Sequence, residues 1–402
     1  MLLARELDDL LIENISETKK REASTFDQLA GKNTPDLIFF GSGDLGRRTL
    51  AGARKLGLSV LCFADNNPKL WNTEVEGLPV FKPEEAIEKF PNAVFVLTIW
   101  SHNLGHPLQQ VNEQINKQGN VKLVSFIFLY WKYPNTFLPY WRCDLPHKTI
   151  DQFELVAAAL NLWSDAASQQ EYFAEITWRL LGDFKNLGSP VKNKQYFPND
   201  IFDLNENEVF IDIGAFDGDT LRDFIEASSN KFLHYHAFEP DPFGFDKLAE
   251  FVSEFLEDAR KKIKIDFFGV GSHHEKIDIE APGIYFKILY PNFTGPRSAE
   301  VKDGMVTVDS YALDELEFEH APTFIKMDVE GFEPNVIFGA KKIIQKYTPI
   351  IAVSIYHKFD HIWKLPLAIN ALSNNYNFYL RPHFMAGWEL VFYAVPKSRV
   401  KI

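Results

Sequence analysis

Short apolar runs alternate with longer amphipathic stretches along most of this 402-residue chain. An apolar run at 36–40 leads into a glycine turn and a stretch of helical periodicity that ends near residue 56, and further apolar runs follow at 59–64 and 93–98. Alternation of strand and helix is typical of a parallel βαβ sheet. We therefore predict a first α/β domain over residues 35–130.

A second α/β pattern begins near residue 209 and continues to the end of the chain, which predicts another domain over residues 206–402. The last two apolar runs flank Arg381-Pro-His383 and indicate a hairpin that ends the sheet. The expected strands lie near 209–213, 233–238, 264–269, 322–327, 349–355, 376–381 and 389–395.

Two further segments complete the predicted organisation. Residues 2–30 carry apolar positions at helical spacing among many charges, so we expect an amphipathic helix in an N-terminal segment, 1–34, that packs on a neighbouring domain. Residues 131–205 begin with clustered aromatics and prolines and continue with an expected helix pair at about 150–164 and 166–182. We interpret this segment as a helical connector.

Composition narrows the classes of protein. The formal net charge of −13 argues against a large contact with nucleic acid, which normally needs a basic surface. Cys62 and Cys143 form no paired motif, so we expect neither a disulfide framework nor a cysteine zinc site. The N-terminus lacks the layout of a secretion signal, and the most apolar stretch, 121–131, is far shorter than the roughly 20 residues that span a bilayer. We expect a cytoplasmic protein without a membrane span or a nucleic-acid partner.

The second pattern opens with a nucleotide-binding fingerprint. Strand 209–213 runs into a turn that starts at Gly214 and ends at Gly218, and these glycines let the backbone approach a ligand closely. Asp219 and Thr220 are suited to cap the helix that follows, whose first amides favour an anionic group.

Two acids frame this turn. Glu239 ends the second strand about twenty residues beyond Gly218, where a carboxylate accepts both hydroxyls of a ribose. Asp212, near the end of the first strand, is placed to meet an ammonium group. A free ribose, an ammonium and a carboxylate together fit S-adenosylmethionine better than a dinucleotide. The predicted cofactor-binding residues are Asp212, Gly214, Ala215, Gly218, Thr220, Glu239, Pro240 and Asp328.

Further acids follow a later apolar strand. Asp328 and Glu330 come directly after residues 324–327, and in an open parallel sheet the loops at the carboxyl ends of the strands hold the ligand. The next strand ends in Tyr356 and His357, and a histidine there is suited to take a proton from a hydroxyl near neutral pH. We hypothesise that His357 is the general base, with Asp328 or Glu330 orienting it or the substrate.

A metal site is the alternative for the same residues. Asp328, Glu330, His357 and His383 offer oxygen and imidazole ligands that suit Mg or Mn. They occur at no short metal-ligand spacing, so we expect no metal. His383 then either reaches the same site or lies at the hairpin turn.

Several blocks of the C-terminal half resemble the FkbM family of S-adenosylmethionine-dependent methyltransferases. The resemblance covers roughly 209–395, and its most specific block is Lys-x-Asp-x-Glu-Gly-x-Glu. It implies a seven-stranded Rossmann-like sheet with an antiparallel final hairpin, and usually O-methylation of a natural-product or carbohydrate hydroxyl. The matching blocks are Asp212-Ile-Gly-Ala, Phe238-Glu-Pro, Val306-Thr-Val-Asp309-Ser, Phe324-Ile-Lys-Met-Asp328-Val-Glu-Gly-Phe-Glu333 and Ser354-Ile-Tyr-His357.

The family resemblance also implies residue roles. It places Asp328 and His357 at the methyl-transfer centre. One departure concerns the first turn, where methyltransferases often carry glycine and this chain has Phe216. The Phe216 side chain must point away from the cofactor for the cofactor to bind. The residues that the resemblance places at the cofactor are Asp212, Gly214, Gly218 and Glu239.

The first domain carries a fingerprint of its own. Gly41, Gly43 and Gly46 fit G-x-G-x-x-G between strand and helix, and Asp65 follows where a ribose-binding acid is expected. Residues 36–100 resemble the N-terminal Rossmann-like domain of PglD-type sugar acetyltransferases, which implies recognition of a nucleotide sugar or glycan. A fold retained for packing or oligomerisation is the alternative. The matching stretches are 40–46, 63–68 and 76–80.

Three function classes follow. The first is an S-adenosylmethionine-dependent methyltransferase with two Rossmann-like domains in tandem, acting on a hydroxyl of a sugar, glycan or related small molecule. The second is an NAD-dependent oxidoreductase or epimerase that uses the first fingerprint, although no Tyr-x-x-x-Lys pair follows it. The third is a non-catalytic nucleotide-sugar-binding protein in which Phe216 blocks the cofactor. The sequence does not identify the methyl acceptor. A homo-oligomer is possible, but the sequence does not give the oligomeric state.

Overall fold

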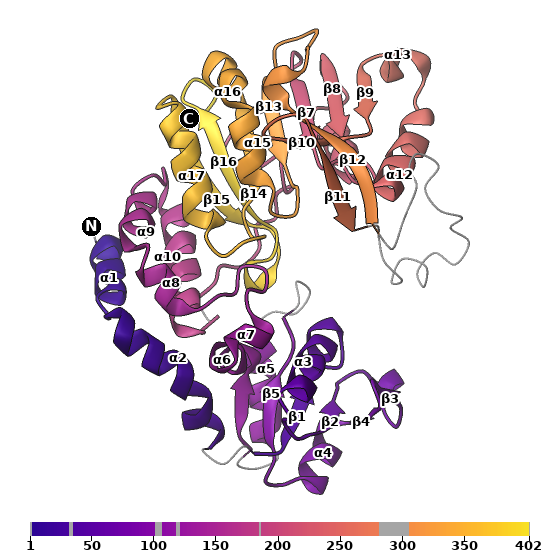
Figure 1. Cartoon of the computed structure of the whole chain (residues 1–402). Helices are drawn as coiled ribbons and strands as arrows, with labels where there is room; N and C mark the ends of the chain where they lie inside the picture. The colour runs from indigo at the N-terminus through magenta and orange to yellow at the C-terminus, as the bar shows by residue number, and fades with distance from the viewer. Residues whose placement is uncertain are drawn as a thin grey trace.

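Each of the two alternating patterns folds into an open sheet with helices packed on it (Figure 1). The computed structural model describes residues 2–31, 35–100, 107–117, 121–184, 186–280 and 305–401. The central strands of both sheets are buried along their whole length, because helices cover both faces of a parallel sheet and leave no alternation of polar and apolar positions. The predicted fold class, two Rossmann-like sheets in tandem, is confirmed.

The first sheet has the strand order β3-β4-β2-β1-β5-β6, and only the pairing of β3 with β4 is antiparallel among its described pairs. Its strands are β1 (Leu37–Phe40), β2 (Val60–Ala64), β3 (Glu74–Val75), β4 (Leu78–Phe81), β5 (Val94–Leu97) and β6 (Leu123–Ser125). Its helices are α3 (Asp44–Lys55), the 3-10 turn η1 (Pro68–Leu70), α4 (Pro83–Lys89), α5 (Pro107–Asn116), α6 (Phe126–Lys132) and α7 (Pro134–Phe137).

The second sheet has seven strands in the order β15-β16-β14-β13-β7-β8-β9. Strand β16 runs antiparallel to both β14 and β15, so the predicted antiparallel final hairpin is confirmed. All seven predicted strands are present with ends shifted by a few residues. They are β7 (Val209–Ile213), β8 (His234–Phe238), β9 (Ile263–Asp266), β13 (Phe324–Met327), β14 (Ile350–Ser354), β15 (Tyr376–Pro382) and β16 (Leu390–Pro396).

A three-stranded sheet, ordered β10-β12-β11, accompanies the second sheet and was not predicted as strands. Its strands are β10 (Gly269–Gly271), β11 (Glu275–Glu280) and β12 (Met305–Ala312), and η2 (Leu313–Glu315) follows them. The helices around the second sheet are α11 (Asp219–Ala227), α12 (Pro242–Ser253), α13 (Glu257–Arg260), α15 (Glu333–Gly339), α16 (Lys341–Tyr347) and α17 (His361–Leu372), with η3 (Met385–Gly387) in the final hairpin. None of the helices in the described part of the chain is long and apolar enough to cross a membrane.

The N-terminal segment forms two helices, α1 (Leu2–Leu11) and α2 (Ile15–Ala30), where one was expected. The break falls at Asn14, whose side chain accepts the backbone N–H of Glu17 as the N-cap of α2. Asparagine favours this position because its side-chain oxygen satisfies an amide that the helix leaves without a partner. The apolar positions keep their helical spacing through this region, but the cap at Asn14 starts a new helix there.

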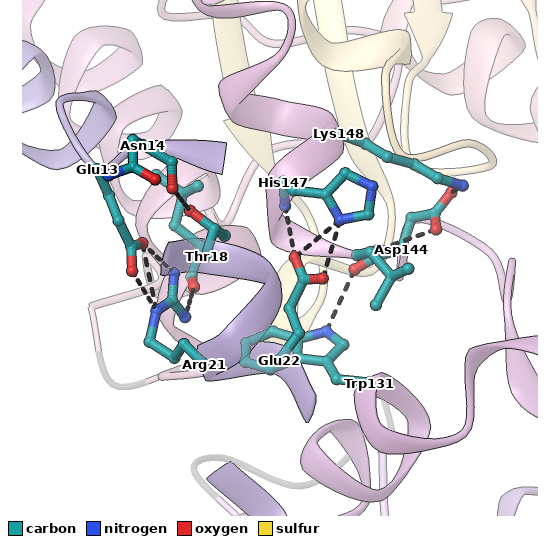
Figure 2. Close-up of polar contacts among 11 residues, drawn as sticks. Glu13, Asn14, Thr18, Arg21, Glu22, Trp131, Asp144, His147 and Lys148 are labelled. Atoms are coloured by element: carbon teal, nitrogen blue, oxygen red, sulfur yellow. Dashed lines mark hydrogen bonds and ion pairs between the residues drawn. The ribbon is translucent and has the colours of Figure 1, made fainter. Parts of the chain in front are cut away.

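Side chains of α2 fasten it to the connector (Figure 2). Glu22 accepts the backbone N–H of His147 at 2.6 Å and contacts the Nδ1 atom of the same residue at 2.9 Å. Arg21 pairs with Glu13 across the break between the helices and also donates to the carbonyl of Leu180. The N-terminal helices thus form part of the framework around the connector.

The connector contributes α8 (Pro146–Ile150), α9 (Phe153–Leu160) and α10 (Ala166–Leu181). Its side chains enter the hydrophobic cores of both sheets: Tyr172 and Ile176 pack in the core of the second, and Trp178 packs in the core of the first. The chain order suggested a separate segment, but these helices share their cores with both α/β units.

An aromatic cluster joins the two units. Trp100, which follows β5, lies with its ring 5.1 Å from that of Trp388 in the final hairpin and donates to the Ala386 carbonyl. The guanidinium of Arg142, 1% exposed, contacts both indole rings. Trp388 in turn contacts Trp141, which neighbours the strand end that carries the candidate base.

Candidate active site

The predicted site residues of the second unit lie along one edge of its sheet. Strands β7, β8, β13 and β14 are parallel neighbours, so their carboxyl ends meet there. Gly214 follows β7, Glu239 follows β8, Asp328 follows β13 and His357 comes shortly after β14. Ligands of open α/β sheets bind at this edge.

Asp212 was predicted to meet an ammonium group, and the structure pairs it with one that belongs to the chain. It is fully buried, and the register of β7 and β13 sets it opposite Lys326, whose Nζ atom lies 3.1 Å from its carboxylate. Tyr235 donates its hydroxyl to the other carboxylate oxygen. The ammonium that Asp212 meets is therefore the chain's own. Lys326 also donates to the Gly214 carbonyl at 2.5 Å, which ties the first turn to the middle of the sheet.

The first turn, from Gly214 to Gly218, packs tightly against the ends of the neighbouring strands. A Cβ atom at Gly214 would collide with the Asp328 carbonyl oxygen, so this glycine permits the close approach of two strand ends. The amides of Gly214 and Ala215 donate to the Phe238 carbonyl, and Ala215 is buried. Gly218 has φ 85° and acts as the N-cap of α11, the helix that Asp219 was expected to cap. Thr220 is 3% exposed, and its backbone N–H donates to Asp219 at 2.6 Å.

Phe216 and Glu239 meet at this turn, where Phe216 is partly exposed and Glu239 is buried. Phe216 adopts φ 44°, a left-handed conformation that costs a residue other than glycine about 1–2 kcal/mol. Its ring lies against Gly244 of α12, and its backbone N–H donates to Glu239 at 2.6 Å. Glu239 also accepts the N–H of Asp241, which Pro240 precedes in the chain. Burial raises the pKa of Glu239 to about 7, and the two N–H donors oppose this rise.

His357 lies at the centre of a cluster of carboxylates. Its Nδ1 atom is 2.7 Å from Glu333, and its Nε2 atom is 3.3 Å from Asp328 and 3.8 Å from Glu330. The ring is 2% exposed, whereas the side chain of Glu330 is 75% exposed. The structure thus brings together the three residues for which catalytic roles were predicted.

The electrostatics of the cluster favour the protonated imidazole. Burial alone would lower the pKa of His357, but the hydrogen bond to Glu333 and the charges of Glu333, Asp328 and Glu330 raise it to about 9. Burial would raise the pKa of Glu333, but its contacts with His357 and His361 hold that pKa far below its usual range. A base at this position is therefore strong and mostly protonated near pH 7.

Sequence reasoning missed other members of the cluster. Tyr196 donates to Asp328 at 2.8 Å, and Tyr356 donates to Glu389 at 3.0 Å. Gln195 donates to Glu389 at 2.6 Å and to the Tyr196 hydroxyl at 3.1 Å. Glu333 stood within the recognised motif, but no local signal marked Tyr196 and Glu389, which long-range packing brings to the site.

His383 comes directly after β15, in the final hairpin. It contacts the hydroxyl of Tyr393 at 2.6 Å, and burial lowers its pKa to about 4.

Within the described ranges, no cluster of three or more His, Cys, Asp or Glu side chains has the arrangement of a metal site. A cavity of about 460 Å³ lies at the opposite edge of the sheet, where Thr323, Thr348 and Arg399 are among its lining residues.

The first fingerprint is also held by internal bonds. Asp65 accepts the backbone N–H of Ser42 at 2.9 Å, its hydroxyl at 2.7 Å and the N–H of Asn67 at 2.8 Å. Asp65 therefore fastens the turn to β2. A Cβ atom at Gly46 would strike the Gly41 carbonyl, so these glycines pack helix against strand, whereas Gly43 has open space before it.

A seven-stranded sheet with an antiparallel final hairpin is consistent with a methyltransferase fold, and the family comparison agrees. Residues 212–380 match the family model described as the methyltransferase FkbM domain. The protein is a methyltransferase that carries an FkbM methyltransferase domain in its C-terminal unit.

Solved structures extend the likeness beyond that domain. The crystal structure of methyltransferase FkbM from Methylobacillus flagellatus KT matches 95% of this chain and 99% of its own, with a TM-score of 0.75 and 18% identity. The fold of the first unit is therefore shared as well.

Two further solved structures match smaller parts of the chain. A precorrin-6y C5,15-methyltransferase from Geobacter metallireducens GS-15 matches 48% of this chain and 82% of its own, with a TM-score of 0.29 and 14% identity. A UDP-D-quinovosamine 4-dehydrogenase from Vibrio fischeri matches 23% of this chain and 76% of its own, with a TM-score of 0.19 and 20% identity. Comparison with curated proteins found no match. The likeness of the first domain to PglD-type acetyltransferases is supported by none of these findings and stays a prediction.

Proposed function

We propose that this methyltransferase uses S-adenosylmethionine to methylate a hydroxyl group of a sugar, glycan or related small molecule. The observation that carries the proposal is the placement of His357. Its Nδ1 atom is bound by Glu333, and its buried Nε2 atom, close to Asp328, has no hydrogen-bond partner in the described structure. An imidazole nitrogen without a hydrogen-bond partner, at the edge of the sheet where ligands bind, is suited to receive a proton.

The residues of the first turn fit an adenosine. Glu239 is a buried carboxyl group whose contacts in the described structure are two backbone N–H groups, so each oxygen keeps a lone pair for a ribose hydroxyl. Ribose donors would stabilise the carboxylate that burial disfavours. Phe216 lies against Gly244 of α12, and in the proposal its side chain, 44% exposed, leaves the cofactor room at the turn. When bound, S-adenosylmethionine supplies a methyl group already activated on a sulfonium.

The protein must then hold the acceptor and remove its proton. In the proposal, Asp328 orients the acceptor hydroxyl and Nε2 of His357 receives its proton. In the proposal, Asp212 acts on the cofactor site through Lys326, its partner at 3.1 Å.

A carbohydrate acceptor is favoured by what surrounds His357. The Trp141 ring lies 6.1 Å from it, and Trp388 contacts Tyr356 at 5.9 Å. Aromatic faces beside carboxylate and amide groups, here Glu389 and Gln195, suit the apolar faces and hydroxyls of a sugar. Transfer of a labelled methyl group to neutral sugars, glycans and nucleotide sugars, measured against amine and thiol acceptors, tests the class; methylation of amines or thiols alone would contradict it.

Glu239→Ala is expected to weaken S-adenosylmethionine binding by about 10- to 100-fold, because two hydrogen bonds to a charged group are lost. Calorimetric titration of purified protein measures the change. The matched control is Asp65→Ala, which removes the acid at the equivalent strand end of the first sheet and should leave the affinity unchanged. Equal affinity of Glu239→Ala and the parent protein would remove the ribose assignment.

A further inference from the structure

Glu333, the first residue of α15, is the most heavily engaged carboxylate of the site. It is fully buried, and its two oxygens divide four contacts between them. Oε1 lies 2.7 Å from Nδ1 of His357 and accepts the backbone N–H groups of Val329 at 3.1 Å and Gly331 at 3.3 Å. Oε2 lies 3.2 Å from Nδ1 of His361. One side chain therefore joins the segment after β14, the start of α17 and the loop after β13.

The contact between Oε1 of Glu333 and Nδ1 of His357 determines which ring nitrogen carries the proton. A carboxylate only accepts hydrogen bonds, so the proton of a neutral imidazole is favoured on the nitrogen that faces it, Nδ1. Nε2 is then left with its lone pair, 3.3 Å from Asp328. A ring turned the other way would give up the shortest contact of this carboxylate.

The backbone contacts extend this control to the neighbouring acids. The N–H groups of Val329 and Gly331 flank Glu330, which has φ 54°, and Gly331 has φ 104°. A non-glycine residue in this conformation is strained and persists only where surrounding bonds hold it. Glu333 supplies two of those bonds, so it holds the loop that presents Asp328 and Glu330.

We propose that Glu333 is the positioning residue of the methyl-transfer site, which keeps a proton on Nδ1 of His357 and so reserves Nε2 for the proton of the acceptor hydroxyl. The inference rests on the proposed function. The acceptor oxygen loses its proton to Nε2, the Nδ1 proton stays in place, and the resulting imidazolium faces the Glu333 carboxylate. His361 lies 3.2 Å from the other oxygen of Glu333, so the carboxylate stands between two imidazole rings.

Several charged and titratable groups act on the His357 ring besides Glu333. Asp328 and Glu330 approach Nε2 from the loop after β13, and Glu389 acts from the start of β16. Tyr356 is its chain neighbour, with ring centroids 4.4 Å apart, and Lys358 follows it in the chain. The distinguishing feature of Glu333 is its contact with Nδ1, so its removal must change the tautomer, whereas the other carboxylates act through charge.

Nitrogen-15 NMR of histidine-labelled protein tests the proposal without a substrate. In the parent protein, neutral His357 above pH 9 is expected to carry its proton on Nδ1; its signals are assigned as those lost in His357→Asn. Glu333→Gln should lower the pKa of His357 by about one to two pH units and reduce the preference for the Nδ1 tautomer. The pH at which kcat reaches half its maximum should fall by the same amount.

Glu330→Gln is the matched control, because it removes a carboxylate near Nε2 and should leave the Nδ1 tautomer in place. The proposal is overturned if neutral His357 of the parent carries its proton on Nε2, or if Glu333→Gln changes neither tautomer nor pKa. The parent spectrum decides the first point even if Glu333→Gln fails to fold. Failure of S-adenosylmethionine to bind would instead contradict the proposed function, and the NMR result does not depend on it.

Discussion

His357→Asn is expected to lower kcat for methyl transfer by about 10²- to 10⁴-fold at saturating cofactor and acceptor, the usual contribution of a positioned general base. The parent rate should also depend strongly on pH. Only the neutral imidazole accepts a proton, and the pKa of His357 is raised to about 9. Below that pH the neutral fraction falls about tenfold per pH unit, so kcat should rise through the neutral range and level off above pH 9. The residual rate of the asparagine variant should lack this rise.

Initial rates with labelled methyl donor from pH 6 to pH 10 measure both effects. His274→Asn is the control, because that side chain is 56% exposed. It lies between β10 and β11 of the three-stranded sheet. A rate of His357→Asn within a few-fold of the parent, or a parent profile that is flat up to pH 9, would assign the proton transfer to another group.

The same shift affects stability in a definite direction. The pKa of His357 is raised in the folded state from the ordinary value of 6.5 to about 9, so the folded protein binds this proton more tightly than the unfolded chain. The stabilisation is fully present below pH 6.5 and is lost as pH rises through 9. The difference in melting temperature between parent and His357→Asn should therefore shrink over that interval, and a difference that grew with pH would contradict the assignment.

Lys326→Met is expected to destabilise the C-terminal unit by about 3–5 kcal/mol, since it leaves Asp212 as a buried carboxylate without its cationic partner. Lys326 is 1% exposed and Asp212 is fully buried, so water does not replace the lost contact. The Gly214 carbonyl loses its donor in the same variant. For a unit of this size, the loss corresponds to a melting temperature lower by roughly 6–20 °C.

Thermal unfolding followed by circular dichroism at pH 7 measures this effect. The double variant Asp212→Asn with Lys326→Met should recover much of the loss, because the unpaired charge is gone. Lys194→Met is the control: its contacts with Asp223 and Glu226 lie near the surface, where an ion pair contributes about 0–1 kcal/mol. Equal stability of Lys326→Met and the parent would show that Asp212 does not depend on Lys326 in the folded protein.

Local patterns predicted the elements well, because burial on both faces gives each central strand an uninterrupted apolar run. They also led to Glu239, Asp328, Glu330 and His357, since parallel strands place their following residues on one edge. The single helix expected at the N-terminus was wrong, because Asn14 caps a second helix there.

The sequence by itself determined the two α/β sheets, the antiparallel hairpin and the edge that carries the site, because these follow from periodicity and from motifs a few residues long. Only the tertiary structure decided the partners of the charged groups. The register between β7 and β13 pairs Asp212 with Lys326. The position of α15 beside the segment after β14 pairs Glu333 with His357. The packing of the connector brings Tyr196 to Asp328. Such contacts join residues that are distant in the chain, and their energies depend on burial that arises only when the layers assemble.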